Sequence, residues 1–158
     1  MERLAAHSNI VGCKLSHGDI SHHAQIGCSS KIDNSKFATF TGLGQQLLPI
    51  LALGCAGTID GTAGFFPKSV VHLYNLCVKK NRDEKDIAEA RTLQAKLSAV
   101  EELVVKFGTV GIKEAVSRVL SIGDRDGTRL PLFGGMGDTE WKNWEGVVGE
   151  LKVVEAAL

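Results

Sequence analysis

The chain has 158 residues, with eighteen basic and eighteen acidic side chains and a formal net charge of zero. This balance offers no electrostatic attraction to nucleic acid or to an anionic membrane surface, so neither is expected as a partner. Hydrophobic residues make up 44% of the chain and charged residues 23%, which is typical of a globular protein. The sequence has no long apolar run and no apolar leader, and we therefore expect a soluble protein of the cytoplasm.

The segment Ile10–Lys14 is predicted to be a strand of a parallel sheet, because it is a short apolar run that Gly18 follows closely. Side chains alternate between the two faces of a strand, so Gly12 and Lys14 share one face. If the sheet closes into a barrel, Gly12 leaves space beside Lys14 at the carboxyl end of the strand, where barrel enzymes carry out their chemistry. Lys14 is then a candidate nucleophile that forms a Schiff base with a carbonyl substrate; the alternative is a lysine that simply extends into solvent.

The next residues alternate between strands and helices, which indicates parallel βαβ units. Helices are expected at 20–28 and 45–53, and further strands at 36–41 and 56–60. From Pro67 onward the pattern is helical, and the expected helices are 67–80, 86–106, 112–120 and 140–158, with Asp138 or Thr139 as the cap of the last one. A Gly-rich loop is expected at 123–138, with Arg129 holding it through a hydrogen bond or an ion pair.

The residues Asn9–Lys14 match, position by position, a strand motif of the dihydrodipicolinate synthase / N-acetylneuraminate lyase family of class I aldolases. The chain resembles this family in three later segments as well, in the family's order: Phe40–Gly42, Gly54–Gly61 and Thr128–Leu132. The resemblance implies an α/β fold, the carboxyl-terminal part of a TIM barrel with three parallel strands, followed by helices. A whole barrel needs roughly 250 residues, so we expect a fragment of a family member.

This resemblance divides the chain into two regions. Residues 1–66 correspond to the sixth to eighth strands of the barrel, and residues 67–158 to the last barrel helix and a carboxyl-terminal helical region. Three strands alone would leave the inner face and an edge of the sheet uncovered. We therefore expect the isolated chain to associate or to need the rest of a barrel, and full-length relatives to be homo-oligomers.

The resemblance also implies an activity. Lys14 would form a Schiff base with a 2-oxo acid of the 4-hydroxy-2-oxoglutarate or 2-keto-3-deoxy sugar acid type, and cleavage would release pyruvate. Neither a cofactor nor a metal is implied. Dihydrodipicolinate synthase is the alternative within the family. A third hypothesis is a non-catalytic product, because the family's tyrosine proton relay and carboxylate-binding loop lie on earlier strands and the only tyrosine here is Tyr74.

Several further residues are candidates for substrate contact. Ser16 matches a position where family members carry a hydroxyl, but it could equally cap the following helix. Gly42 and Leu43 begin a tight turn that would contact the substrate through its backbone, and the family's sialic-acid-cleaving branch carries acidic residues where Leu43–Gln45 stand here.

A second group of candidates ends the third strand at the same barrel mouth, opposite Lys14. It consists of Asp60, Gly61 and Thr62. The Asp60 carboxylate would either accept a hydroxyl of the substrate or cap a turn, and the sequence leaves both open.

Histidines and cysteines lie near these segments. His17, His22 and His23 with Asp19 fit no usual zinc spacing and are interpreted as polar histidines on a helix face. The four cysteines lack close pairing and are interpreted as buried free thiols of a reducing compartment.

Overall fold

The computed structural model describes all residues from Met1 to Leu158. Its three strands, β1 (Gly12–Leu15), β2 (Ala38–Thr41) and β3 (Gly57–Thr58), form one parallel sheet in the order β1-β2-β3. Helix α2 (Ile20–Gly27) connects the first two strands, and the 3₁₀ helix η1 (Gly44–Gln46) with α3 (Leu47–Ala52) connects the next two. This repeated strand–helix order confirms the predicted α/β fold with three parallel strands.

The three strands are shorter than the segments predicted from the sequence, but backbone hydrogen bonds between neighbouring strands continue beyond their ends. The Ala38 amide donates to the Val11 carbonyl at 2.8 Å, and the Ile59 amide donates to the Thr41 carbonyl at 2.9 Å. The first strand continues one residue past the predicted end at Lys14, to Leu15. The sheet thus carries Lys14 within a paired strand rather than at its frayed end.

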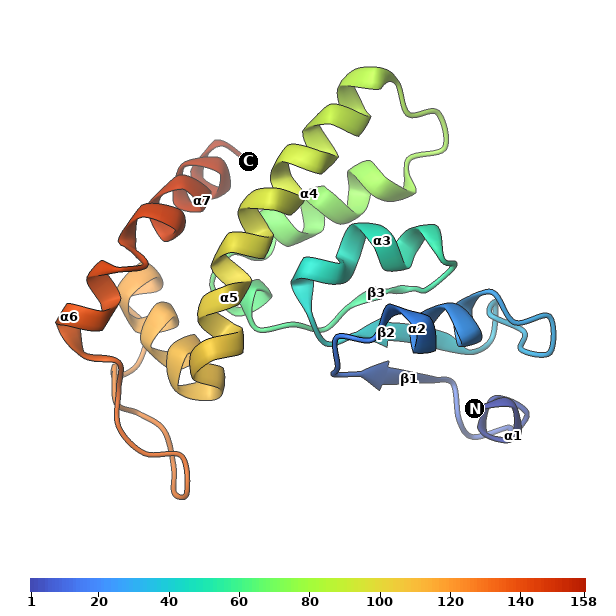
Figure 1. Cartoon of the computed structure of the whole chain (residues 1–158), viewed down its shortest axis with the longest axis horizontal. Helices are drawn as coiled ribbons and strands as arrows, with labels where there is room; N and C mark the ends of the chain where they lie inside the picture. The colour runs from blue at the N-terminus through green and yellow to red at the C-terminus, as the bar shows by residue number, and fades with distance from the viewer.

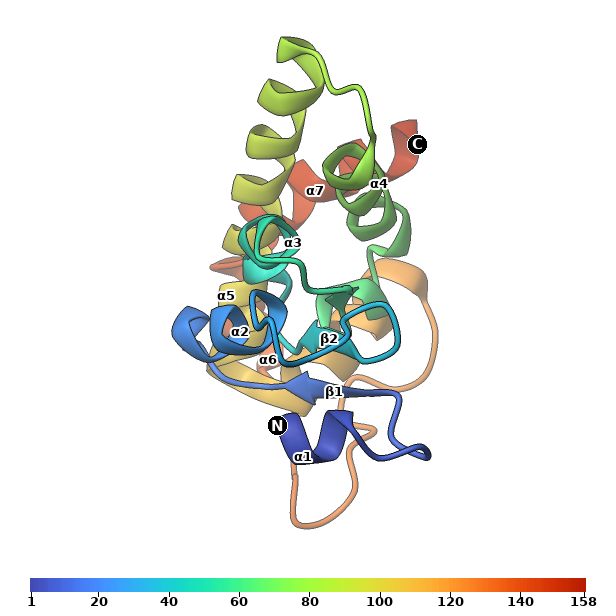
Figure 2. The same cartoon turned by 90° about the vertical axis from the view of Figure 1, so that its right-hand side faces the viewer.

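The helical region packs beside the β3 end of the sheet, and β1 is the strand farthest from α4 (Figures 1 and 2). Its helices are α4 (Pro67–Val78), α5 (Glu84–Leu120), α6 (Gly137–Lys142) and α7 (Glu145–Ala157). Two short elements complete the chain, α1 (Glu2–Ala5) and the 3₁₀ helix η2 (Thr62–Gly64). None of the helices combines the length and the apolar character that a bilayer crossing requires.

One prediction about these helices is confirmed and one is wrong. The helices predicted at 86–106 and 112–120 are two helical segments of α5 that meet at a kink, where Gly108 has a non-helical backbone with a φ of 55° that glycine adopts without strain. The predicted last helix is two helices, because the chain turns at Asn143 and Trp144. Asp138 therefore lies inside the first turn of α6 and does not cap a helix that runs to the end.

The main hydrophobic core lies among α3, α4, α5 and α7. Phe65 and Phe66 are fully buried at its centre, with ring centroids 5.0 Å apart, and Leu73, Leu97 and Val100 pack around them. Burial of each such side chain stabilises the fold by roughly 1.5–3 kcal/mol. The helical region thus has a core of its own. This core holds α5 in position, and the turns after β2 and β3 pack against that helix.

The sheet has much less cover. Only a small cluster of Ile26, Ile32 and Phe37 is buried between α2 and the strands. Val11 is 73% exposed and Ile59 52% exposed, although both belong to apolar strand segments. An apolar strand segment of this type is normally covered on both faces in an α/β protein. The exposure of these residues agrees with a barrel that this chain completes only in part.

The loop from Ser121 to Met136 is held by Arg118 and Arg125, and not by Arg129 as predicted. The buried Glu114 carboxylate accepts hydrogen bonds from the Met136 amide at 2.6 Å and from Arg118 Nε at 2.9 Å. Arg125 pairs with Asp138 at 2.9 Å. Arg129 is exposed and takes part in none of the chain's ion pairs.

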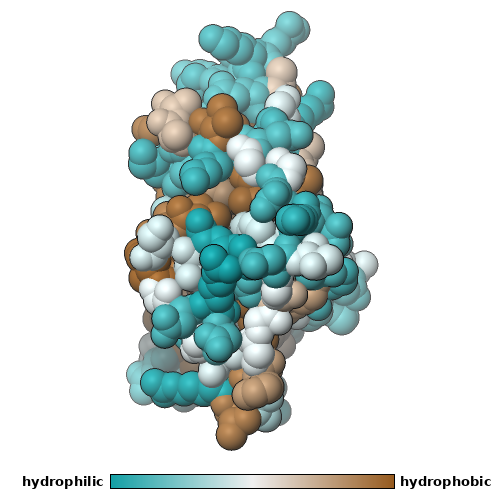
Figure 3. Space-filling view, turned by 90° about the vertical axis from the view of Figure 1, so that its left-hand side faces the viewer, coloured by the Kyte–Doolittle hydropathy of each residue, from teal (hydrophilic) through white to brown (hydrophobic).

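The tip of this loop is apolar and open to solvent. Leu130 is 82% exposed and Phe133 85% exposed. Figure 3 shows apolar side chains at the end of the molecule from which the loop protrudes in Figure 1. The loop therefore adds to the apolar surface that the isolated chain presents.

The cysteines are free, but they are not all buried as predicted. Cys55 is buried, Cys28 is exposed, and Cys13 and Cys77 are half-buried. Burial raises the pKa of the Cys55 and Cys77 thiols. Cys28 ends α2 at the surface, because the helix stops there and turns toward Leu53.

Candidate active site

Lys14 lies on the inner face of the sheet. The parallel register pairs it with Phe40 of β2, which in turn pairs with Gly57 of β3, and residues paired in this way project to the same face. Its side chain is exposed, and no ion pair of the chain involves its amine. The amine is thus free to meet a ligand at the open inner face.

Gly12 serves a different purpose from the one that the sequence suggested. A β-carbon at this position would collide with the carbonyl oxygen of Ala38 on the neighbouring strand. The missing side chain therefore lets the backbones of β1 and β2 approach each other closely. It sets the position of β1, and with it the position of Lys14.

Ser16 and Gly42 meet Lys14 at the carboxyl ends of β1 and β2. A β-carbon at position 42 would be 2.9 Å from Lys14 Cε and would collide with Ser16 Oγ. The cap of α2 is Asp19, whose side chain accepts a hydrogen bond from the Ser21 amide at 2.7 Å, so Ser16 does not serve as that cap. Lys14, Ser16 and Gly42 form what we call the Lys14 cluster.

The turn that begins at Gly42 is fixed by a buried polar network. The Thr41 hydroxyl accepts a hydrogen bond from the Leu43 amide at 3.1 Å and donates one to Gln46 Oε1 at 2.6 Å. Gln46 Nε2 donates to the His17 carbonyl at 3.4 Å, which ties this turn to the one after β1. Thr41 and Gln46 were not predicted as part of a network, although a polar residue that ends a buried strand, followed by a polar turn, is a signal of one.

Asp60, Gly61 and Thr62 face α5. The Asp60 carboxylate accepts a hydrogen bond from the Ala63 amide at 2.9 Å, which is the turn-capping alternative left open by the sequence. A β-carbon at Gly61 would be 2.8 Å from a methyl group of Val104 on α5. These three residues thus lie against α5, and substrate contact by Asp60, Gly61 and Thr62 stays a prediction.

Glu101 on α5 contacts this second group and is not among the residues predicted from the sequence. Its side chain is fully buried, and Oε1 accepts a hydrogen bond from the Thr62 amide at 3.1 Å. Burial, together with the nearby charge of Asp60, raises the pKa of Glu101 to about 7. The signal was available: Glu101 lies on the apolar stripe of its helix, between Leu97 and Val104.

The histidines correct one prediction. His23 is fully buried instead of lying on a polar helix face, because α2 turns this side chain inward and its Nδ1 lies 3.0 Å from the Asp19 carbonyl. His17 and His22 remain near the surface, with ring centroids 5.1 Å apart. Nowhere in the structure do three His, Cys, Asp or Glu side chains gather closely enough to hold a metal ion.

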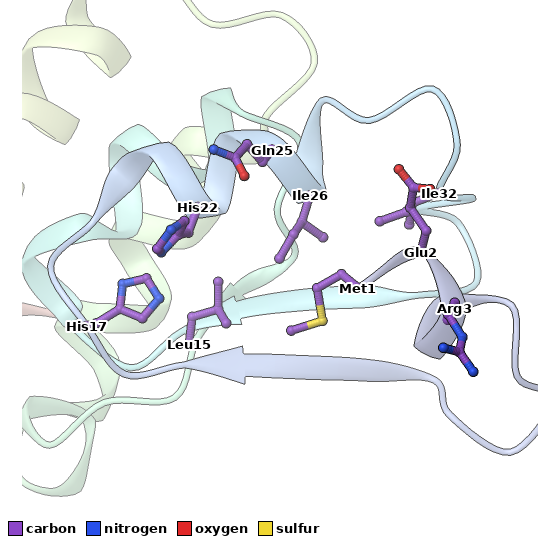
Figure 4. A pocket seen from close by; sticks show the side chains of 9 residues that line it. All are labelled: Met1, Glu2, Arg3, Leu15, His17, His22, Gln25, Ile26 and Ile32. Atoms are coloured by element: carbon purple, nitrogen blue, oxygen red, sulfur yellow. The ribbon is translucent and has the colours of Figure 1, made fainter.

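A cavity of about 500 Å³ lies between α1, β1 and α2 (Figure 4). Leu15 lines it, and Figure 4 shows this side chain together with His17 and His22 on one side of β1. Because neighbouring side chains of a strand alternate, Lys14 points to the other side. This cavity is therefore separate from the Lys14 cluster.

Comparisons with known proteins agree with this geometry. A 4-hydroxy-tetrahydrodipicolinate synthase of Nitrosospira multiformis is 34% identical over 131 residues, which are 82% of this chain and 40% of the relative. A mitochondrial protein of Emericella nidulans named as a 4-hydroxy-2-oxoglutarate aldolase is 31% identical over 122 residues, covering 77% of this chain and 37% of the relative.

Solved structures show the same fold. The dihydrodipicolinate synthase of Acinetobacter baumannii, solved with pyruvate, superposes with a TM-score of 0.76 at 24% identity over 95% of this chain and 48% of its own. This chain thus spans about two fifths of the length of the curated relatives and about half of the solved barrel. The model of the dihydrodipicolinate synthetase family matches residues 1–140. The chain belongs to the dihydrodipicolinate synthetase family.

Proposed function

We propose that this chain forms the Schiff-base half of a class I aldolase that cleaves a 2-oxo acid and releases pyruvate. The observation that carries the proposal is the position of Lys14, a free amine on the inner face of the sheet beside Gly42, in a chain of a family whose members include named aldolases. The substrates proposed are 4-hydroxy-2-oxoglutarate or a 2-keto-3-deoxy sugar acid.

In this mechanism the Lys14 amine adds to the 2-oxo carbon and water leaves, which gives an iminium ion. The 4-hydroxyl of the substrate then gives its proton to a base of the completed barrel, and its oxygen becomes the carbonyl of the departing aldehyde. The iminium takes up the electron pair of the breaking carbon–carbon bond and becomes an enamine. Protonation of the enamine and addition of water then release pyruvate and restore the amine. No metal or organic cofactor takes part in these steps.

The Lys14 cluster supplies two further groups. Ser16 Oγ, which like Lys14 Cε would neighbour a β-carbon at position 42, is proposed to hydrogen-bond an oxygen of the substrate. The backbone of Gly42 and Leu43 borders the same space, and the absence of a side chain at position 42 leaves room for the substrate beside Lys14. Asp60, Gly61 and Thr62 are proposed to support the turns at the carboxyl ends of the strands from the side of α5.

The isolated chain is proposed to be a poor catalyst. It spans about two fifths of the length of its curated relatives. General acid–base help contributes on the order of 10² to 10⁴ in rate, and the only tyrosine, Tyr74, lies on α4 outside the Lys14 cluster. A completed barrel, which we expect to be a homo-oligomer of the reducing cytoplasm, would supply the missing groups.

The second candidate function is that of a 4-hydroxy-tetrahydrodipicolinate synthase, which the Nitrosospira relative favours by its name. It would begin with the same lysine–pyruvate adduct and then join it to an aldehyde acceptor. The two functions therefore share the role of Lys14 and differ in the fate of the adduct.

An assay on a completed barrel tests the proposal. The chain is joined to the amino-terminal half of a family relative, and pyruvate release from 4-hydroxy-2-oxoglutarate is measured. We expect release to be lost in the Lys14→Ala variant and kept in Lys36→Arg, which changes an exposed lysine that pairs with Asp33. Condensation of pyruvate with an aldehyde, without cleavage of 4-hydroxy-2-oxoglutarate or a 2-keto-3-deoxy sugar acid, would favour the synthase. Cleavage that survives Lys14→Ala would refute both candidate functions.

A further inference from the structure

Two carboxyl groups, that of the fully buried Glu101 and that of the half-buried Asp60, meet where α5 touches the turns after β2 and β3. One oxygen of each has a partner: Glu101 Oε1 accepts from the Thr62 amide at 3.1 Å, and Asp60 Oδ1 accepts from the Ala63 amide at 2.9 Å. The other two oxygens, Asp60 Oδ2 and Glu101 Oε2, are buried and have no donor. A β-carbon at Gly44 would be 2.9 Å from Glu101 Oε1 and 3.1 Å from Asp60 Cγ, so the two carboxyl groups lie together beneath Gly44.

Two ionised carboxylates are not stable in such a place. Each would lack a donor for one buried oxygen, and their like charges would repel at low solvent exposure. A single proton removes both problems, since a protonated carboxyl is a donor and its ionised partner an acceptor.

No basic side chain is placed to neutralise the pair of carboxylates in place of a proton. The elements packed around the pair are η1, η2 and α3, which have no ionisable residue, and β3 with the residues that come after it, where the only one is Asp60. The basic residues of α5 nearest in sequence are already paired, Lys96 with Glu150 and Lys106 with Glu140. On α4 and α7, His72 pairs with Glu89, and Glu155 accepts hydrogen bonds from the amide groups of Lys68 and Ser69. Tyr74 of α4 packs toward β3, where a β-carbon at Gly57 would be 3.7 Å from its ring, but its phenol is not a basic group.

We propose that Asp60 and Glu101 share one proton, and that this proton holds the turns after β2 and β3 on α5, which makes Glu101 a positioning residue for the Lys14 cluster. The first half of the proposal stands on the carboxyl geometry alone, whereas the effect on Lys14 rests on the proposed aldolase function. Consistent with a shared proton, the pKa of Glu101 is raised to about 7 by burial and by the charge of Asp60.

The connection to Lys14 runs through one short turn. Gly44 contacts the carboxyl pair, and its carbonyl accepts a hydrogen bond from Gln94 of α5 at 3.1 Å. Gly42, two residues earlier in the same turn, is the residue whose missing β-carbon leaves room for Lys14. Repulsion between two ionised carboxylates would push Gly44 away from α5 and disturb the space beside Lys14.

Amide substitutions test whether one proton is shared. In Glu101→Gln the amide Nε2 donates to Asp60 Oδ2, and in Asp60→Asn the amide Nδ2 donates to Glu101 Oε2, so each single variant replaces the shared proton by a permanent donor. In the double variant one N–H must face another, whichever way the amides are turned. We therefore expect each single variant to fold stably and the double variant to lose more stability than the sum of the two single changes.

The measurements are thermal unfolding at about pH 5.5 and about pH 8.5 and carboxyl ¹³C titration of the wild-type protein, in the full chain and in the completed barrel. Wild type and the control Glu102→Gln, which changes the exposed neighbouring glutamate, should melt at a lower temperature at the higher pH. Glu101→Gln should lose most of this dependence. An additive double variant, or a wild-type pair in which both carboxyls ionise below about pH 5, would overturn the shared proton.

The positioning role has its own readout. The rate at which borohydride traps pyruvate on Lys14 is compared between Glu101→Gln and wild type at each pH, so that the titration of the lysine itself cancels. The trapping rate of Glu101→Gln divided by that of wild type should be near one at about pH 5.5 and should rise several-fold at about pH 8.5. A constant ratio would overturn the positioning role, and a complete absence of trapping would refute the aldolase function while the unfolding data still decide whether the proton is shared.

Discussion

Gly42 lies so close to Lys14 that a β-carbon at position 42 would be 2.9 Å from Lys14 Cε. Lys14 lies in β1 and Gly42 directly follows the neighbouring parallel strand β2, so their close approach borders the space in which a substrate carbonyl would meet the amine. The Gly42→Ala substitution should therefore displace Lys14 or Ser16, and a displacement of about 1 Å is expected to slow borohydride trapping of pyruvate by roughly a hundredfold.

Gly149 provides the matched control for this change. It lies in α7, where an added β-carbon meets nothing within 4 Å. The Gly149→Ala variant should trap pyruvate at the wild-type rate and be more stable by roughly 0.5–1 kcal/mol, as expected for alanine in a helix. Equal trapping by Gly42→Ala would mean that the lysine acts elsewhere.

Thr41→Val tests the buried network of the turn after β2. The change removes the donor to Gln46 Oε1 and the acceptor of the Leu43 amide, and it should cost roughly 1–3 kcal/mol in the free energy of unfolding. Thr39→Val is the control, since the Thr39 hydroxyl is buried too but is contacted only by the Cys13 thiol at 3.9 Å. Chemical denaturation compares the two variants, and equal losses would contradict the account of the network.

The free energy of unfolding should depend on pH through Glu101. Its pKa in the folded chain is about 7, above the ordinary value of 4.5 that it regains on unfolding, so the folded state binds the proton more tightly. The resulting stabilisation is fully present below about pH 4.5 and is lost as the pH rises through about 7, with a total of roughly 3 kcal/mol. Denaturation in urea over this range measures it, and a stability that increases steadily through neutral pH in wild type but not in Glu101→Gln would have the wrong sign.

Arg118→Ala should destabilise the helical region by roughly 3 kcal/mol, because it leaves the buried Glu114 carboxylate without its ionic partner. Arg129→Ala should change the free energy of unfolding by no more than about 0.5 kcal/mol, since Arg129 is exposed. Thermal melts of the two variants provide the comparison. If Arg129→Ala were the more harmful change, the loop from Ser121 to Met136 would be held differently.

The isolated chain should not be a stable monomer. Val11 and Ile59 on the sheet and Phe133 on the protruding loop are more than half exposed, and apolar surface of this kind favours association. Sedimentation at tens of micromolar should therefore show dimers or larger species. A monomer with one sharp cooperative melt would show that the open sheet is stable without cover.

The sequence was sufficient for the three parallel strands and for the face of the strand that carries Lys14, because strand periodicity is a local rule. It did not predict the close approach of Gly12 to Ala38, which depends on how β1 packs against β2. The place of Glu101 on the apolar stripe of α5 was a signal that its side chain is buried. Its position beside Asp60 and Thr62 could not be predicted, because those residues come from a distant segment of the chain.

Two helical features escaped for similar reasons. The break between α6 and α7 at Asn143 and Trp144 contains no glycine or proline that would have predicted a helix end, and it results from how the helices pack. The interior position of His23 likewise depends on the packing of α2 against the sheet, which no local pattern encodes.

The most direct test of the central claim is to locate the lysine that pyruvate modifies. The completed barrel is treated with pyruvate and borohydride, digested, and its peptides are analysed by mass spectrometry. The account predicts one reduced adduct, on the peptide that contains Lys14, and none in Lys14→Ala. An adduct on another lysine, or no adduct at all in a folded barrel, would contradict it.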